Sequence, residues 1–186
     1  MKLHFVRVAL VAVLAISLPV GELIAQGSKF STSAGNTRFS SETPLENINA
    51  ENKKSQVILN TANGEMAIRM NMRDFVFPNK LMQEHFNENY IESDKYPTAT
   101  FSGKIDTAPD FSKDGQYDVA ATGKFTVHGV TKERKLKGKL KVEGDKITIT
   151  SNFEVPLTDH KIEIPQVVFV KIAQVIQVKV EYVLKR

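Results

Sequence analysis

Residues 117–142 read YDVAATGKFTVHGVTKERKLKGKLKV, and the period of this stretch decides the fold. Alternating apolar and polar residues lie on opposite faces of a β-strand. One face of the first half carries Tyr117, Val119, Ala121, Gly123, Phe125 and Val127, and one face of the second half carries Leu136, Gly138, Leu140 and Val142. The stretch therefore predicts two long, half-buried strands with a turn at His128-Gly129-Val130.

The same period continues on both sides of this hairpin. Gly144-Asp145 turns the chain into a strand over 147–155, and a last strand spans 172–184. Upstream, residues 98–105 alternate again after Pro97, and Asp114-Gly115 predicts a tight turn before Tyr117. Consecutive antiparallel hairpins are the simplest topology for these strands.

Earlier residues add more strands and one helix. Residues 26–42 allow two short strands, and residues 55–72 predict a hairpin because Asn63-Gly64 suits a type I′ turn. Apolar residues recur at helical spacing over 79–89, with Asn79 as N-cap. A sheet of long strands removes its exposed edges by closing on itself. We predict an all-β, lipocalin-like antiparallel barrel of eight strands, with one short helix between strands.

The first residues have the features of a secretory signal peptide. Lys2 and Arg7 give a positive start, and residues 8–18 are apolar except for Ser17. This run is shorter than the ~20 residues that span a bilayer. Pro19 and Gly21 then break the helix ahead of a cleavage site expected after Ala25. We predict a signal peptide over 1–25, one domain over 26–186, and a periplasmic or secreted protein.

The composition narrows the class of protein. The 186 residues are 41% hydrophobic and 25% charged, as in an ordinary globular domain. The sequence contains no cysteine, and a domain of this size can be stable through its hydrophobic core alone. The formal charge of +4 falls by one unit when Lys2, Arg7 and Glu22 leave with the signal peptide. That charge is too mild to indicate nucleic-acid binding.

The predicted inner faces raise the question of a ligand. An eight-stranded barrel either fills with side chains or holds one small ligand. Here Phe101 and Phe125 alternate with Gly103, Gly123 and other small residues. Such gaps either leave a tunnel or relieve crowding and bend the strands, and both interpretations stay open. Because the inner faces between 117 and 155 carry no charge, a cavity there should hold an apolar molecule.

Two stretches resemble a known family. Residues 95–101, KYPTATF, and 123–132, GKFTVHGVTK, are similar to the "KYP-x-A-x-F" and "G-x-L-T-x-x-G-V-T-K" patterns of the YceI-like family of exported polyisoprenoid-binding proteins. The likeness covers roughly residues 55–184 and departs at 33–36, SAGN, where the family's early strand usually carries Ala-His-Ser. The resemblance implies a lipocalin-like barrel that encloses a long isoprenoid chain, in some members a quinone tail, without an enzymatic step.

We therefore expect an isoprenoid-type lipid or quinone tail as ligand, no other cofactor and no catalytic residue. The expected ligand-binding residues lie on inward strand faces and on the helix: Phe101, Ile105, Phe125, Leu136, Leu140, Ile149, Phe153, Met82 and Phe86. The helix would act as a lid over one mouth, or simply pack there. His85, His128 and His160 show no metal-ligand spacing, so no metal site is expected.

Two other functions remain open at this level. An exported hydrolase or isomerase acting on a lipid would need a buried acid–base pair at the mouth, such as Asp159 with His160. An envelope interaction protein would have a filled barrel and use its loops or the lysines at 135, 137, 139 and 141. Those lysines suit ordinary strand patterning or a transient membrane contact. We expect a monomer or a homodimer.

The signal peptide gives a first testable prediction. When a bacterial host expresses and exports the full chain, the recovered protein should begin at Gln26, because Ala25 ends the cleavable segment. Intact-protein mass spectrometry of the periplasmic and secreted fractions reads this N-terminus directly. Protein that stays in the membrane fraction with residues 1–25 attached would contradict the prediction.

Overall fold

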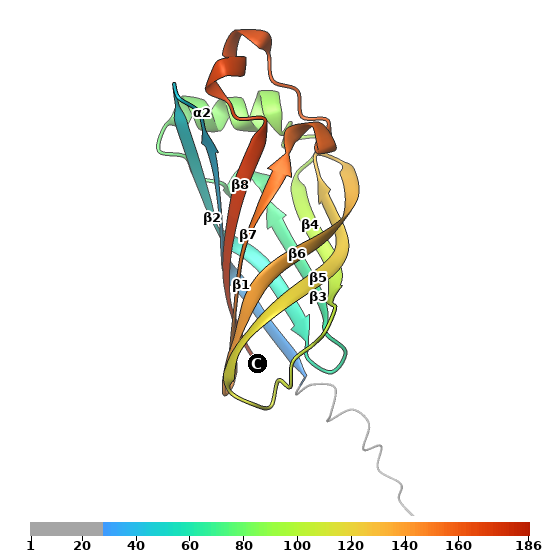
Figure 1. Ribbon diagram of the computed structural model, residues 1–186. Helices are drawn as coiled ribbons and strands as arrows, with labels where there is room; N and C mark the ends of the chain where they lie inside the picture. The colour runs from blue at the N-terminus through green and yellow to red at the C-terminus, as the bar shows by residue number, and fades with distance from the viewer. Residues whose placement is uncertain (1–27) are drawn as a thin grey trace, which may run out of the picture.

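Eight antiparallel strands close into a barrel in the computed structural model, which describes residues 28–186. The strands are β1 (Lys29–Glu42), β2 (Asn47–Asn60), β3 (Glu65–Asn71), β4 (Thr98–Ile105), β5 (Gly115–Val127), β6 (Val130–Glu143), β7 (Lys146–Pro156) and β8 (Val175–Lys185). Each strand pairs with the next, and β1 pairs with β8 to complete the ring (Figure 1). The predicted fold class is confirmed, whereas the predicted signal peptide lies outside the described residues.

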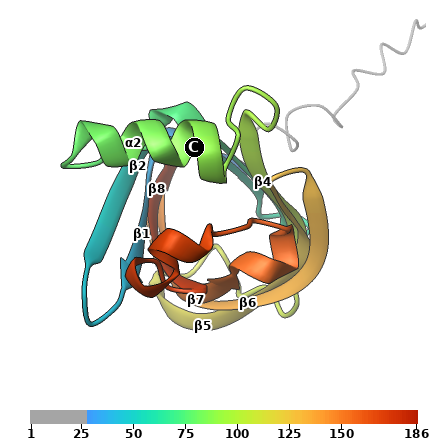
Figure 2. The ribbon, with the colours of Figure 1, turned by 90° about the horizontal axis from the view of Figure 1, so that it is seen from above.

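Short helices gather at one end of the barrel, which we call the helical end (Figure 2). Helix α2 (Lys80–His85) begins as predicted at Asn79, whose side-chain oxygen accepts hydrogen bonds from the N–H groups of Leu81 and Met82. It continues into a π-helical turn, η2 (Phe86–Tyr90). Across the described residues, no helix is both long and apolar enough to cross a bilayer.

Three 3-10 helices were not predicted from the sequence. They are η1 (Met72–Asp74), η3 (Leu157–His160) and η4 (Gln166–Lys171), and β8 consequently starts at Val175 instead of at residue 172. Their short lengths give too few residues for a helical period to emerge.

The N-terminal strands are longer than their sequence suggests. Residues 29–42 form one strand instead of two short ones, and β2 starts at Asn47, well before the predicted hairpin. The first half of β2 reads NINAENKK and lacks a strong apolar alternation. It becomes a strand because it pairs with β1 from Glu42↔Asn47 onward.

The structure confirms the turn predicted at His128-Gly129 and corrects the one predicted at Asn63-Gly64. His128 and Gly129 join the paired residues Val127 and Val130 with φ angles of 50° and 70°, the signs that a type I′ turn requires. The Asn63-Gly64 prediction was wrong in turn type, because Gly64 alone has positive φ and its N–H donates to the Asn60 carbonyl at 2.8 Å.

The tight turn predicted at Asp114-Gly115 was also wrong. The β4–β5 connection spans residues 106–114 instead. Asp114 has another role there, because its carboxylate accepts a hydrogen bond at 2.8 Å from the N–H of Gly144 in the β6–β7 turn. Gly144 itself, with φ of 56°, does turn the chain as predicted.

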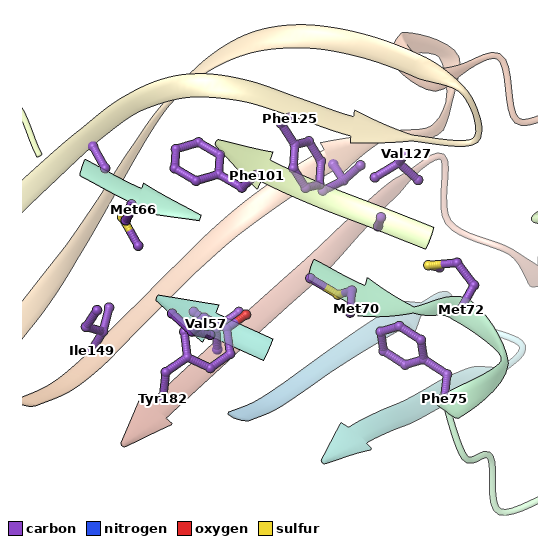
Figure 3. Close-up of a cluster of buried hydrophobic side chains, with 14 of the residues drawn as sticks. Val57, Met66, Met70, Met72, Phe75, Phe101, Phe125, Val127, Ile149 and Tyr182 are labelled. Atoms are coloured by element: carbon purple, nitrogen blue, oxygen red, sulfur yellow. The ribbon is translucent and has the colours of Figure 1, made fainter. Parts of the chain in front are cut away.

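A layer of side chains divides the barrel into two halves. Leu140, Ile149 and Tyr182 are paired across β6, β7 and β8. The Tyr182 ring continues this layer over Gly35, where an added Cβ would lie 2.6 Å from Tyr182 Cδ1. Figure 3 shows Tyr182 next to Val57 within this core. The half away from the helical end is filled by fully buried side chains: Phe30, Leu59, Val142, Ile147 and Leu184.

Glycines inside the barrel relieve crowding instead of leaving a tunnel. Gly103 and Gly123 face each other across β4 and β5. A Cβ on Gly123 would lie 2.4 Å from both Gly103 Cα and the Ser102 carbonyl oxygen, and the Phe101 ring already occupies the space beside Gly103. Of the two interpretations of these glycines, the structure therefore supports relief of crowding, because two backbones approach closely here.

This contact predicts the effect of one added methyl group. Gly123→Ala should lower the free energy of unfolding by about 1–3 kcal/mol, because two strands must separate to admit the Cβ. Urea unfolding followed by circular dichroism measures the loss. Ser102→Ala is the matched control, since Ser102 is exposed on the neighbouring strand. Equal stability of both variants would contradict the close packing.

Candidate functional site

An apolar cavity of about 400 Å³ occupies the half of the barrel at the helical end. Sites for small molecules commonly measure about 300–1,000 Å³. The walls come from strand residues such as Phe39 on β1, Ala99 on β4 and Val178 on β8. The roof comes from α2 and η2 on one side and from residues 157–172 on the other (Figure 2).

Three hydroxyl groups lie at the floor of this cavity. Thr37 lines it, and the Thr37 hydroxyl is 2.9 Å from both the Ser55 and the Tyr182 hydroxyls. All three residues are buried, and burial raises the pKa of Tyr182 to about 12. Tyr182 therefore stays a neutral hydrogen-bonding group that fixes its ring across the barrel.

A cluster of four phenylalanines forms the wall beneath α2. The Phe39 ring lies 5.3 Å from the Phe75 ring and 5.5 Å from the Phe86 ring, centroid to centroid, and Phe77 lies 5.0 Å from Phe86. These ring contacts attach α2 and its π-helical turn to strand β1. The helix therefore packs against the side of the barrel and also lines the cavity.

Polar side chains in the lining gather toward the helical end. Glu46 lies in the β1–β2 connection, Asn79 and His85 belong to the cap and end of α2, and Lys171 ends η4. Deeper on β1, Ser41 accepts a hydrogen bond at 2.8 Å from the Ala173 N–H, which anchors the segment before β8. The cavity thus combines an apolar interior with polar groups of both charges near its mouth.

The structure brings four of the predicted ligand-binding residues together in the lining: Met82, Phe86, Phe125 and Phe153. The other five lie outside it. Leu140 and Ile149 belong to the dividing layer, and Ile105 packs in the filled half. The Phe101 ring turns toward Gly103, and Leu136 packs, partly buried, against the core. The prediction that these side chains face inward was correct. The alternation of apolar and polar residues, however, does not indicate how deep along the barrel axis each side chain lies.

Sequence reasoning missed much of the lining. Phe39, Ile48, Phe75 and Phe77 contribute from β1, β2 and the segment after β3, and Leu157, Ile162 and Ile172 contribute from the segment before β8. The Phe75-Val76-Phe77 run was an available signal, since two aromatic side chains two positions apart point to the same side. The residues between β7 and β8 have no period that would place them inside.

The two stretches that resemble the family meet in a structural clasp beside the cavity. The Tyr96 ring packs 4.4 Å from the His128 ring and fills the space where Gly129 lacks a side chain. His128 Nδ1 donates to the His160 carbonyl at 3.0 Å, and Nε2 lies 2.9 Å from the Glu92 carboxylate. The clasp joins the segment after α2, the β5–β6 turn and η3.

His160 is held as a core residue. Its ring is buried, donates from Nδ1 to the Val130 carbonyl at 3.1 Å, and lies edge-on to Phe125 at 5.3 Å. Asp159, the proposed partner in an acid–base pair, lies 3.9 Å from Arg134 instead. Within residues 28–186, no group of three His, Asp or Glu side chains could hold a metal ion.

Comparisons with known proteins agree with this geometry. The family model of the YceI-like domain matches residues 24–184. A polyisoprenoid-binding domain from Saccharophagus degradans, implicated in plant cell wall breakdown, has a TM-score of 0.71 at 16% identity over 85% of this chain and 98% of its own. Burkholderia cenocepacia BcnA has a TM-score of 0.67 at 18% identity over 82% and 96%. The Campylobacter jejuni YceI protein has 0.57 at 16% over 72% and 80%. None of the curated proteins matches the chain.

The buried His160 predicts how stability depends on pH. Burial is the main cause that lowers the pKa of His160 below 6.5. At a pH between the folded and the unfolded pKa, the unfolded chain therefore binds a proton that the folded chain does not bind. His160 therefore contributes fully to the free energy of unfolding above pH 6.5, and this contribution decreases as pH falls through the folded pKa. Wild type should therefore lose stability below pH 6.5 more steeply than His160→Gln, by at most about 1.4 kcal/mol per pH unit. Urea titrations across about pH 5–8 measure this difference, and parallel profiles would contradict it.

Proposed function

The chain belongs to the YceI-like domain family, and we propose that it binds an isoprenoid-type lipid in the cavity of its barrel. One observation carries the proposal: the barrel is hollow in one half, and that hollow is lined almost entirely by apolar side chains. A barrel of eight strands can fill itself, so a hollow half suggests a ligand. The solved polyisoprenoid-binding domain with the same fold supports the choice of lipid.

The lining suits a branched, unsaturated chain. Aromatic rings of Phe39, Phe86 and Phe125 offer flat apolar contacts, while Met70 and Met82 can adjust their side chains to an irregular shape. Each buried CH₂ group of a tail would contribute about 0.8 kcal/mol of transfer free energy. The apolar tail therefore enters the cavity and ends above the layer formed by Tyr182.

The polar part of the lipid would stay at the helical end. Glu46, His85 and Lys171 are the lining residues that offer charged or titratable groups there. The deep hydroxyl of Thr37 already bonds to Ser55 and Tyr182. A quinone or alcohol headgroup therefore finds hydrogen-bonding partners beside the roof, where both donors and acceptors stand.

The role we propose is that of a carrier or buffer without chemistry, acting in the periplasm or after secretion. Its apolar cavity protects a lipid that water does not dissolve. The alternative of a lipid-modifying enzyme was based on a possible acid–base pair of Asp159 and His160, and these two residues do not form that pair. The alternative of a filled barrel applies to one half of the interior and not to the other.

Native mass spectrometry of the exported protein, followed by organic extraction, tests this function. A prenyl lipid or quinone at one equivalent per chain would support the proposal and name the ligand. Protein that emerges empty and takes up neither farnesol nor a short ubiquinone from detergent solution would overturn it.

A substitution that fills the cavity sharpens the test. Val178 lines the cavity on β8, so Val178→Phe should reduce bound lipid by about tenfold or more, the change that about 1.4 kcal/mol produces. Val183→Phe is the matched control, because Val183 faces outward on the same strand. Lipid content is read by extraction, and folding by circular dichroism. Equal lipid content in the two folded variants would place the ligand elsewhere.

A further inference from the structure

Exposed apolar side chains concentrate around the mouth of the cavity. Among residues 28–186, Ile58 and Val183 are exposed on outer strand faces away from the mouth. The other large exposed apolar side chains belong to the β1–β2 connection and to the segments that roof the cavity or adjoin its roof: Leu45, Val76, Leu81, Val167, Phe169, Val170 and Val175. We call these seven residues the rim.

The rim differs from single, scattered surface residues because several of its exposed apolar side chains lie close together in the chain. Val167 is 84% exposed, Phe169 51% and Val170 59%, all within one 3-10 helix. Leu81 projects from α2 on the opposite side of the roof at 57% exposure. Clustered exposed apolar side chains of this kind mark interaction sites.

The rim is continuous with the cavity. Leu81 is both exposed and part of the lining. On η4, Val168 lines the cavity while its neighbours Val167 and Phe169 face solvent. On α2 and on η4, apolar side chains of the roof therefore reach both the cavity and the solvent. Such a path lets an apolar chain pass between the cavity and another apolar phase without crossing water.

We propose that the rim docks the helical end of the barrel onto the surface of a lipid bilayer, where the cargo enters and leaves. The proposal rests on the proposed function for its cargo, but the docking itself needs no cargo. Partly inserted apolar side chains on short helices are a common means of holding a protein at a membrane interface.

The charges near the rim indicate the kind of bilayer. The charged residues on α2 and the segment over 157–171 are Lys80, Lys161, Lys171, Glu84, Asp159 and Glu163, and Glu46 lies in the β1–β2 connection. Both signs are present in similar numbers, so this face is not a polybasic patch for anionic lipids. Docking should therefore depend on apolar insertion, occur on zwitterionic lipid and resist added salt.

The absence of tryptophan from the sequence provides a direct probe. Phe169→Trp places a single fluorophore on the rim, and Val183→Trp places one on the far half of β8 as the matched control. On phosphatidylcholine vesicles, the emission of the Phe169→Trp variant should shift to the blue and be quenched by brominated lipid. The emission of the Val183→Trp variant should not change. Equal responses of both reporters, or of neither, would overturn the proposal.

Flotation of the protein with phosphatidylcholine vesicles tests the rim by removal. The variant Val167→Gln/Phe169→Gln/Val170→Gln should float about tenfold less than wild type, while Ile58→Gln/Val183→Gln should float like wild type. All versions share the same N-terminus, so residues 1–27 cannot produce the difference. Wild type that does not float, equal losses in both variants, or flotation that requires phosphatidylglycerol and disappears in high salt would each overturn the docking.

A separate loading assay keeps this proposal distinct from the proposed function. The rim residues altered above do not line the cavity, so the rim variant should take up farnesol from detergent solution as wild type does. Its transfer of a prenyl lipid out of vesicles should fall about tenfold. Failure of wild type to load farnesol would refute lipid binding, while the flotation result would still decide the docking.

Discussion

The ring of Tyr182 lies across the barrel in the space that a side chain at residue 35 would occupy, and the two halves of the interior depend on this contact. Its hydroxyl bonds to Thr37, which in turn bonds to Ser55, so the ring is fixed by neighbours on two other strands. On one side of it the strands pack their side chains against one another to full burial, which supplies the stability of a chain without disulfides. On the other side the interior is free to hold a ligand.

A hollow half must be kept open by something other than its contents. Here the roof is fixed from both sides. The phenylalanine cluster attaches α2 to β1, and the clasp of Tyr96, His128 and Glu92 holds the neighbouring loops to η3. Gly129 belongs to the clasp because its positive φ makes the turn and its missing side chain admits Tyr96. The motifs that resemble the family thus build the frame of the mouth, and they also contribute Ala99, Phe125 and Val127 to the lining of the cavity.

The sequence predicted the fold well because a period of two is a local property that survives in every half-buried strand. It predicted α2 well because Asn79 caps it through contacts within three residues. Depth along the barrel axis is not local. Phe101 and Phe125 face each other across β4 and β5, yet only Phe125 lines the cavity, because the ring of Phe101 turns toward Gly103. No pattern within one strand distinguishes these two positions.

Some of the residues that shape the cavity come from segments whose own sequence gives little sign of structure, such as Ile48 on β2 and Leu157, Ile162 and Ile172 before β8. The first half of β2 is rich in Asn, Glu and Lys, and the segment between β7 and β8 mixes apolar and charged residues without a period. Both are ordered by neighbours distant in the chain, such as β1 for the former and Ser41 for the latter. Because the segment between β7 and β8 lies outside the strands of the barrel, substitutions in it should alter the shape of the cavity and its mouth more than barrel closure. Ligand binding and fold stability nevertheless share residues, because lining residues such as Phe86, Phe125 and Val155 also belong to the buried hydrophobic core.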